Sequence, residues 1–349
     1  MEKPLSEYGK STETISVDFD FLAIEEPKDP PLFKSQDASL KSVIVSSMRN
    51  EGLLITEWVA HYKVLGFDRI IIYSNSNDDL SGQMLDILHD AGIVEHIHNE
   101  VAPGLSPQMK AFRHAFYHNR TVAAAEWCTF LDADEFLIPV VENKIVGISD
   151  FIDVISQTYG ADGVALNWRW FGGDTSFNLG DGLVMERFRT ASWNDHVKTL
   201  FRLRAANSIA IHTPIYSQDA KVIGADGEAR ALPSASQSQQ GSLLGQVNHY
   251  WNRTFVEFYV KRQRGRGAVG DGSKRDWADF FKWGVGSNGV DPWPDQDHLG
   301  KVKAEMSRIR KIDGYAEAEA EMIDLFQSLT QKEEIRRLYD EHRPVMLED

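Results

Sequence analysis

The chain has 349 residues, of which 42% are hydrophobic, and a formal net charge of −15 at pH 7. This length and composition allow one large or two small packed domains and exclude a globally disordered protein. So acidic a protein is unsuited to binding nucleic acid by neutralising phosphates, and an anionic ligand would need a metal ion or a local group of basic side chains.

One cysteine, Cys128, rules out an intramolecular disulfide and suits a reducing compartment. The first ten residues are polar and lack the apolar core of a signal peptide. No run approaches the roughly 20 apolar residues that span a bilayer. We therefore expect a cytoplasmic protein and leave peripheral contact with a membrane open.

Residues 1–40 are polar and interrupted by Pro30 and Pro31, which predicts an irregular extension. From residue 41 onward, short β-branched runs alternate with segments of helical periodicity, two of which stop at Gly66 and Gly92. Strands are predicted at 41–47, 69–74, 93–97 and 127–131, and helices at 51–65, 81–91 and 107–125. This alternation predicts an α/β fold with a mostly parallel sheet flanked by helices.

The pattern loosens after Phe136. Here we predict a helix at 149–157, strands at 163–170, 183–189 and 198–204, an aromatic-rich helical segment at 248–264, and a charged helical tail over about 300–345. Residues 217–246, rich in Ser, Gln, Ala and Gly, show no periodicity and predict a loop.

Three polar clusters follow predicted strands, at 48–51, 74–79 and 132–135. Ligands of parallel sheets bind beyond the carboxyl ends of the strands, so these clusters predict a binding edge. In an extended segment Asp132 and Asp134 point to the same side and could hold one Mn²⁺ or Mg²⁺ ion, which neutralises a diphosphate leaving group. The alternative is a turn in which both aspartates bond to backbone amides.

Several segments in order around this cluster resemble GT-A glycosyltransferases of the family-two-like branch, which is also related to the family-92 enzymes. The resemblance covers about 41–270 and rests on residues 43–51 (VIVSSMRNE), 57–62 (EWVAHY), 65–68 (LGFD), 130–136 (FLDADEF), 167–172 (NWRWFG), 186–188 (ERF) and 248–250 (NHY).

The resemblance implies a Rossmann-like GT-A domain over 41–270, with a nucleotide-sugar half at 41–136 and an acceptor half at 137–270. Residues 271–349 would form a helical C-terminal extension. The implied activity is metal-dependent transfer of a hexose from a UDP-linked donor to a hydroxyl of a glycan or glycolipid. We expect direct displacement with inversion, in polysaccharide biosynthesis.

For the donor, the resemblance points to the ends of the first two strands, the long helix and the acidic cluster. The implied contacts are Ser47, Arg49, Asn50, Glu51, Asn75, Asn77, Asp78, Gln108, Arg113 and Asp132. Helix capping is the alternative role for Asn50 and Glu51. Of the basic residues after 260, we assign Lys261 and Arg264 to the diphosphate; a solvated helix face is the alternative for this group.

The metal site of this fold often gains a histidine from the C-terminal part, and His249 and His212 are the two candidates. We favour His249, together with Asp132 and Asp134, because it lies in the stronger motif; a structural histidine is the alternative for either. His114 and His118 are four residues apart on a predicted helix, but no third ligand is evident, which favours packing or surface positions.

For the acceptor we expect a platform of Trp168, Trp170 and Phe171, beside Gly172 and Glu135, because aromatic faces stack on sugars; burial in the core is the alternative. Inverting transfer also needs a carboxylate that deprotonates the acceptor hydroxyl. Asp174 is the first choice by position, and Glu186 and Asp195 are the others. In the acceptor half the chain departs from the Glu-Asp dipeptide that many family-two enzymes carry.

Two other classes of function compete with this interpretation. A metal-dependent phosphohydrolase or nucleotidyltransferase also clusters carboxylates, but would favour more of them or a Gly-rich, Lys-bearing phosphate loop, and the P-loop pattern does not occur. A non-catalytic sugar-binding protein could keep the same fold. The intact acidic residues Asp132, Asp134 and Glu135 speak against it.

Overall fold

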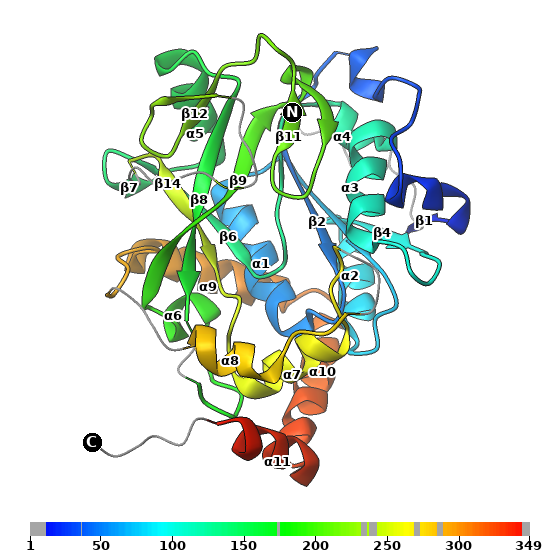
Figure 1. Ribbon diagram of the computed structural model, residues 1–349, viewed down its shortest axis with the longest axis vertical. Coiled ribbons are helices and arrows are strands. Elements are labelled where there is room, and N and C mark those ends of the chain that lie inside the picture. The colour runs from blue at the N-terminus through cyan, green and yellow to red at the C-terminus, as the bar shows by residue number, and fades with distance from the viewer. Residues whose placement is uncertain are drawn as a thin grey trace.

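The computed structural model describes residues 12–35, 37–172, 175–231, 236, 243–268, 273–284 and 289–343. Its centre is a large mixed sheet in the order β1-β4-β3-β2-β5-β9-β8-β14-β6-β7 (Figure 1), with β12 and β13 added beside β8. The strands are β1 (Glu13–Ile15), β2 (Leu40–Met48), β3 (Arg69–Ser74), β4 (Glu95–Asn99), β5 (Ala125–Phe130), β6 (Glu135–Val141), β7 (Lys144–Ile145), β8 (Gly163–Phe171), β9 (Ala191–Arg202), β12 (Val222–Gly224), β13 (Ala229–Arg230) and β14 (Gly245–His249). A separate antiparallel pair is formed by β10 (Ala206–Ile209) and β11 (Pro214–Tyr216).

The first five strands in this order are parallel to their neighbours, and β9 joins β5 in antiparallel direction. Helices cover the sheet: α1 (Gly52–Leu65), α2 (Ser81–Asp90), α3 (Pro107–His118), α4 (Arg120–Ala123), α5 (Ile148–Asp153), α6 (Val184–Arg187), α7 (Phe255–Gln263), α8 (Trp277–Gly284), α9 (Gln296–Ile309), α10 (Tyr315–Thr330) and α11 (Glu333–His342). The predicted α/β architecture, with a large sheet between helices and a helical C-terminal part, is confirmed.

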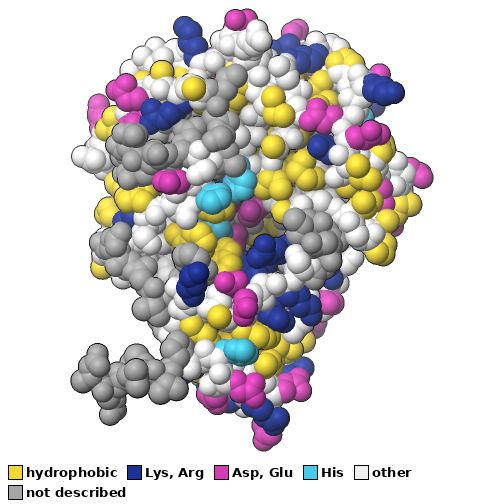
Figure 2. All heavy atoms as spheres, viewed as in Figure 1, with side chains coloured by type: hydrophobic (Ala, Val, Ile, Leu, Met, Phe, Trp, Pro, Cys, Tyr) yellow, Lys and Arg dark blue, Asp and Glu magenta, His cyan; other side chains and the backbone are white. Residues whose placement is uncertain are grey.

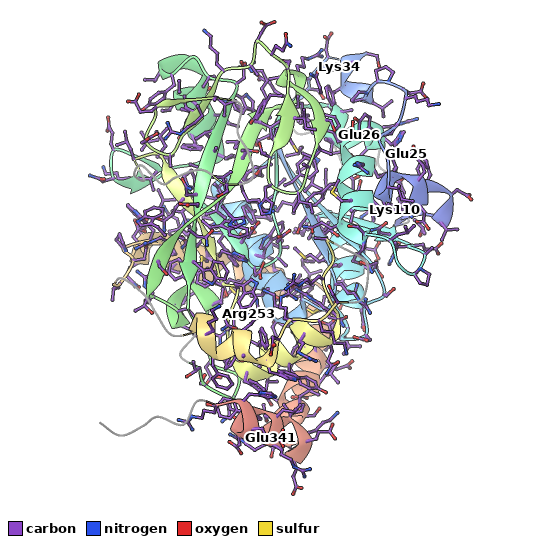
Figure 3. All side chains as sticks on the ribbon, in the orientation of Figure 1. Glu25, Glu26, Lys34, Lys110, Arg253 and Glu341 are labelled. Carbon is purple, nitrogen blue, oxygen red and sulfur yellow. The ribbon has the colours of Figure 1, made fainter. Side chains whose placement is uncertain are left out.

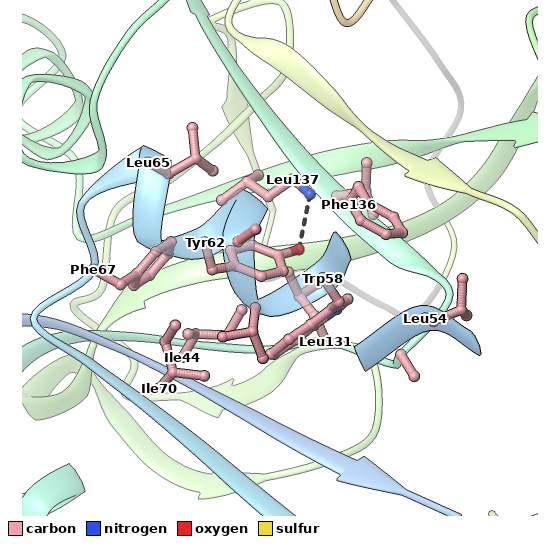
Figure 4. Packing of buried hydrophobic residues seen from close by; sticks show 14 of the residues in the cluster. Ile44, Leu54, Trp58, Tyr62, Leu65, Phe67, Ile70, Leu131, Phe136 and Leu137 are labelled. Carbon is pink, nitrogen blue, oxygen red and sulfur yellow. Dashed lines mark hydrogen bonds between the residues drawn. The ribbon is translucent and has the colours of Figure 1, made fainter. Parts of the chain in front are cut away.

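Strand β2 shows why the parallel half is buried on both faces. Ile44 and Met48 belong to the apolar core that includes α1, whereas Val43 and Val45 belong to the core that includes α3. A strand that is buried on both faces has a continuous run of apolar residues, and this pattern predicts the strand at 41–47. Figure 4 shows the first core around Trp58 and the other large side chains of α1.

The C-terminal helices share that first core. Residues of α9 and α10, including Leu299, Val302 and Met322, are buried in the same cluster as α1. A third cluster joins α7, α8 and α11 through Phe255, Phe280 and other rings. The predicted domain boundaries remain a prediction. The C-terminal helices pack on α1, in the part of the chain that is predicted to bind the nucleotide. Within the described residues, no helix is both long and apolar enough to cross a bilayer.

The N-terminal segment is more ordered than predicted. Besides β1 it contains the 3-10 helices η2 (Val17–Ala23) and η3 (Leu32–Lys34). The buried Lys110 of α3 holds η2 in place: its Nζ donates to Ser16 O and to Asp20 Oδ1, each at 2.8 Å (Figure 3). The irregular composition of 1–40 concealed this structure because it depends on a partner 90 residues away in the chain.

Four other local predictions need correction. The predicted strand 183–189 contains the short helix α6, whose first turn donates to the carboxylate of Glu57. The predicted helix 107–125 is two helices, because Asn119 caps α4 after α3 ends. The segment 248–264 begins as the end of β14, and α7 starts only at Phe255. The described part of the predicted loop 217–246 includes β12 and β13 and the start of β14.

Candidate active site

A cleft of about 610 Å³ lies beyond the carboxyl ends of β2, β3 and β5, as the three polar clusters predicted. Histidine, acidic and basic side chains gather around a hollow near the centre of this face (Figure 2). The polar and aromatic side chains that line the cleft are Ser47, Arg49, Glu51, Asn75, Ser76, Gln108, Asp132, Asp134, Trp168, His212, His249, Trp251, Lys261, Arg264, Arg266 and Arg275.

The acidic cluster lies at a turn between β5 and β6, and two side chains of α1 form hydrogen bonds with its backbone. Trp58 Nε1 lies 3.2 Å from Asp132 O and 3.1 Å from Glu135 O, and Tyr62 Oη donates to Glu135 O at 2.9 Å. The same hydroxyl accepts the backbone N–H of Leu137 at 2.9 Å (Figure 4). These buried donors satisfy carbonyls at the strand end, so the turn projects its two aspartates into the cleft.

Asp132 faces the cleft between two polar partners. Gln108 Nε2 of α3 donates to its Oδ1 at 2.6 Å, and Lys198 Nζ of β9 lies 3.5 Å from its Oδ2. The side chain of Asp132 keeps 30% of its surface exposed. It therefore remains accessible to a ligand while its orientation is set from two sides.

Glu135 is a buried companion of this pair. Its side chain is fully buried, and Lys198 Nζ lies 3.3 Å from its Oε2, which also accepts the backbone N–H of Asp132 at 2.8 Å. Burial raises the pKa of Glu135 to about 8, whereas Lys198 acts to lower it. The buried ammonium of Lys198 is thus shared by two carboxylates, and the two carboxylates raise its pKa although burial opposes them. No sequence signal singled out Lys198.

Asp134 is buried and paired on its Oδ2 with two side chains. Lys261 Nζ of α7 forms a close ion pair with this oxygen, and His249 Nε2 lies 3.6 Å from it. Burial acts to raise the pKa of Asp134, but Lys261 and His249 outweigh it and hold the pKa well below the ordinary value. Asp134 is therefore ionised, as a metal ligand or an ion-pair partner must be.

His249 completes this side of the cleft. Burial lowers its pKa, so the imidazole is neutral at neutral pH. Its ring centre lies 4.2 Å from that of Trp168, and its Nδ1 is buried without a hydrogen-bond partner. Within the described residues, Asp132, Asp134 and His249 do not form a group whose ligand atoms all lie within 4.8 Å of one another. Of the three predicted metal ligands, the structure brings Asp134 and His249 into contact, whereas Asp132 contacts Gln108 and Lys198.

A basic wall faces these carboxylates. Arg264 pairs with Glu51 Oε1, and Arg253 NH2 lies 3.6 Å from Glu51 Oε2. Arg253, labelled in Figure 3, is itself buried just before α7. Burial lowers the pKa of Lys261 to about 8 and that of Arg275 to about 10. Concentrated positive charge in a partly buried cleft attracts an anionic ligand, even though the whole protein is acidic.

The predicted donor contacts separate into two groups. The structure brings Ser47, Arg49, Glu51, Asn75, Gln108, Asp132, Lys261 and Arg264 together on the cleft wall. It does not place Asn50, Asn77, Asp78 or Arg113 among the lining residues.

The residues outside the cleft wall hold the loops together. Asn50, at φ 51°, accepts the backbone N–H of Asp78 at 3.0 Å and donates its own backbone N–H to Asn77 Oδ1 at 3.0 Å. Arg113 donates to Leu22 O at 2.9 Å, which ties α3 to η2. The capping alternative does not apply to Glu51, whose side chain makes no cap bond; Asp79 instead accepts the N–H of Gly52 at the start of α1.

Of the predicted acceptor residues, Trp168 lines the cleft, and the other four lie outside its lining. Phe171 is 1% exposed, and its ring centre lies 4.7 Å from that of Tyr250. The alternative of burial in the core therefore applies to Phe171. Trp170 packs 5.5 Å from Trp251, an aromatic residue that does line the cleft. Gly172 is buried beside Thr190 O, and Glu135 is the buried partner of Lys198.

Neither of the two predicted bases that the structure describes lines the cleft. Asp174 lies outside the described residues. Glu186 pairs with Lys303 at 2.6 Å, and neither it nor the exposed Asp195 lines the cleft. The structure brings in His212 instead, on the loop between β10 and β11, with its Nδ1 3.3 Å from Val197 O. His114 and His118 pack against Phe19, as the sequence favoured.

The comparison with known families identifies one family. The profile of glycosyltransferase family 92 matches residues 45–264, well over half of the chain. A family 92 protein of Ricinus communis is 32% identical over 93 residues, which are 27% of this chain and 16% of the relative. One of Oryza sativa subsp. japonica is 27% identical over 117 residues, 33% and 19% of the two chains. The aligned segments thus span less than a fifth of either relative.

The solved structures matched include the crystal structure of S. aureus TarS 1–349, at 11% identity and a TM-score of 0.35, covering 88% of this chain and 93% of that one. Glucosyl-3-phosphoglycerate synthase of Mycobacterium tuberculosis in complex with phosphoglyceric acid has 13% identity and a TM-score of 0.32, covering 80% and 90%. From the extent of the family match, this chain belongs to glycosyltransferase family 92.

Proposed function

We propose that this family 92 protein is a glycosyltransferase that uses a divalent cation to transfer a hexose from a UDP-linked donor to a hydroxyl of a glycan or glycolipid. The observation that carries the proposal is the composition of the cleft. Carboxylates of the acidic turn, an imidazole and a basic wall line the same 610 Å³ space at the carboxyl edge of the parallel strands. This arrangement suits a nucleoside diphosphate, whose phosphates need positive charge and whose sugar hydroxyls need acceptors.

Asp134 and His249 are the proposed metal ligands. Oxygen and imidazole donors suit Mn²⁺, and the two ligand atoms lie 3.6 Å apart in a buried wall. Lys261 contacts the same oxygen of Asp134, so its ammonium and a metal ion compete for that carboxylate. When bound, the cation neutralises charge on the diphosphate leaving group. Arg264, Arg266 and Arg275 line the opposite wall, where they bind and orient the phosphates.

Asp132 is proposed to bind the donor rather than complete the metal site. Its two oxygens are oriented by Gln108 and Lys198, and its exposed part faces the cleft. A carboxylate whose orientation is fixed in this way is a strong acceptor for ribose or sugar hydroxyls. The acceptor side of the cleft is proposed to run past Trp168 and Trp251, whose ring faces can stack on a sugar.

For the base we propose His212. Among the described side chains that line the cleft, the carboxylates are paired with cations: Glu51 with Arg264, Asp132 with Lys198, and Asp134 with Lys261. His249 lies beside Asp134 and is already proposed as a metal ligand. Burial lowers the pKa of His212 to about 4, which keeps it neutral, and Val197 O accepts from its Nδ1. That tautomer leaves the lone pair of Nε2 free to take the acceptor proton in a direct displacement with inversion. Asp174 remains the alternative base.

A screen of nucleotide sugars by calorimetry, with and without Mn²⁺, tests this function. We expect one UDP-sugar to bind only with Mn²⁺, and Asp134→Asn to abolish that binding. Asp90→Asn, an exposed aspartate at the end of α2, is the matched control and should bind as the wild type. Unchanged donor affinity in Asp134→Asn would refute the metal assignment. The active protein should form a glycoside only when an acceptor is present, which separates transfer from donor hydrolysis and from sugar binding alone.

A glycan or glycolipid acceptor in polysaccharide biosynthesis, a cytoplasmic location and peripheral membrane contact stay predictions from the sequence. Fractionation of cells that express the full chain tests the last two.

A further inference from the structure

Three metal-ligating side chains meet outside the cleft, between β4 and α2. His96 and His98 stand two residues apart on β4 and therefore point to the same face, where Asp86 of α2 reaches them. His96 Nδ1 lies 2.7 Å and His98 Nε2 lies 3.2 Å from Asp86 Oδ1. Within the described residues this is the only group of three such side chains whose ligand atoms all lie within 4.8 Å of one another.

We propose that Asp86, His96 and His98 bind a divalent transition-metal ion, with Zn²⁺ the best fit. Two imidazoles and one carboxylate are donors that zinc prefers, and bonds of about 2.0–2.2 Å place tetrahedral ligand atoms roughly 3.4 Å apart. The separations of 2.7 and 3.2 Å approach that value, so binding needs only small side-chain movements. The donor set is softer than that of the cleft, where carboxylate oxygens predominate.

The ring of His96 is already oriented as a ligand. The side chain is fully buried, and its Nε2 bonds to Ser74 Oγ at 2.8 Å, which leaves Nδ1 directed at Asp86. Metal-binding histidines usually have their second nitrogen held by such a hydrogen bond. His98 and Asp86 keep 38% and 42% of their side-chain surface exposed, so a fourth position is open to water.

The cluster is separate from the cleft but connected to its floor. None of the three residues is a lining residue of the cleft. Ser74 Oγ, which holds His96, also accepts from Asn77 Nδ2 at 3.0 Å, and Asn77 Oδ1 accepts the backbone N–H of Asn50 at 3.0 Å. A metal ion bound to the cluster would stabilise the loop after β3, whose Asn75 and Ser76 line the cleft.

Calorimetric titration with Zn²⁺ tests the proposal on the full chain after treatment with a chelator. The experiment uses the Asp134→Asn background, because Asp134 and His249 in the cleft could also bind zinc. We expect one equivalent of zinc to remain bound in that background. Adding His98→Asn or Asp86→Asn should weaken it at least tenfold, as expected when one of three ligands is lost. Both positions are partly exposed, so these variants should fold.

The matched control is His342→Asn, which removes an exposed histidine of α11 and should leave zinc affinity unchanged. The melting temperature should also rise with zinc in the Asp134→Asn protein and not in the Asp134→Asn/His98→Asn protein. Zinc affinity that is the same with and without His98, or that disappears with Asp134→Asn alone, would overturn the proposal. Neither outcome bears on donor binding, which is measured separately with Mn²⁺ and a UDP-sugar.

Discussion

Glu57 offers a quantitative test of how burial acts in this fold. It lies on α1, is 4% exposed, and accepts the backbone N–H groups of Val184 at 2.7 Å and Met185 at 3.1 Å, which begin α6. Burial raises its pKa to about 7, more than these hydrogen bonds lower it. The native state therefore favours the protonated side chain, compared with an unfolded chain in which the pKa is 4.5.

The sign and size of the effect follow from linkage. A group whose pKa is raised on folding contributes stability that is fully present below pH 4.5 and is lost as the pH rises through about 7. The difference between the two pKa values, at about 1.4 kcal/mol per pH unit, corresponds to about 3 kcal/mol. Glu57→Gln removes the titration but keeps the shape. The free energy of unfolding of the variant minus that of the wild type should therefore increase by about 3 kcal/mol between pH 4.5 and pH 8.

Urea unfolding followed by tryptophan fluorescence at several pH values measures this difference. The control is Glu257→Gln, at a buried carboxylate whose pKa is lowered because Arg253 and Arg187 outweigh burial. Its stabilising contribution is present above pH 4.5 and is lost as the pH falls, so this variant should lose stability relative to the wild type as the pH rises. If the difference in free energy of unfolding between wild type and Glu57→Gln stays constant within about 1 kcal/mol from pH 4.5 to 8, the reasoning is refuted.

Three further predictions concern the cleft and the strands that build it. His212→Gln should lower kcat by about 100- to 10,000-fold with little change in donor affinity; steady-state kinetics in which only Asp174→Asn has this effect would move the base to that residue. Lys198→Met should cost about 3–5 kcal/mol in urea unfolding above about pH 8, where Glu135 is ionised, because it leaves this buried carboxylate without its cation; the double variant with Glu135→Gln should recover part of the loss, and strict additivity would contradict the pairing. Gly245→Ala should cost at least about 2 kcal/mol, because Gly245 has φ +107° and its Cβ would collide with a carbonyl oxygen of β6; an unchanged melting temperature would count against this.

Much of the parallel half could be predicted from the sequence. The strand 41–47 is an apolar run because both its faces are covered, and glycine signals mark the ends of the neighbouring helices. The acidic turn follows a strand whose carboxyl end must face the ligand side of a parallel sheet. These features depend on local periodicity and on a general topological rule. The positions of Asp132 and Asp134 on the cleft wall followed from them.

The cation that a carboxylate pairs with could not be predicted in the same way. Lys198 lies on β9, 63 residues after Glu135, and reads in the sequence as an ordinary lysine in a strand. Likewise, α6 resembled a strand because its helical first turn depends on the buried Glu57, more than 120 residues earlier. Both features arise when elements distant in sequence pack and must satisfy each other's polar groups.

The sequence by itself determined the α/β class, the binding edge of the sheet and the carboxylates placed there. Only the tertiary structure decided that Phe171 turns into the core, that Glu186 and Asp195 stay away from the cleft, and that His212 enters it. The physical reason is the distance in sequence over which each interaction acts. Periodicity records which face of an element is buried, whereas the partner of a buried charge or ring is chosen by packing between distant elements.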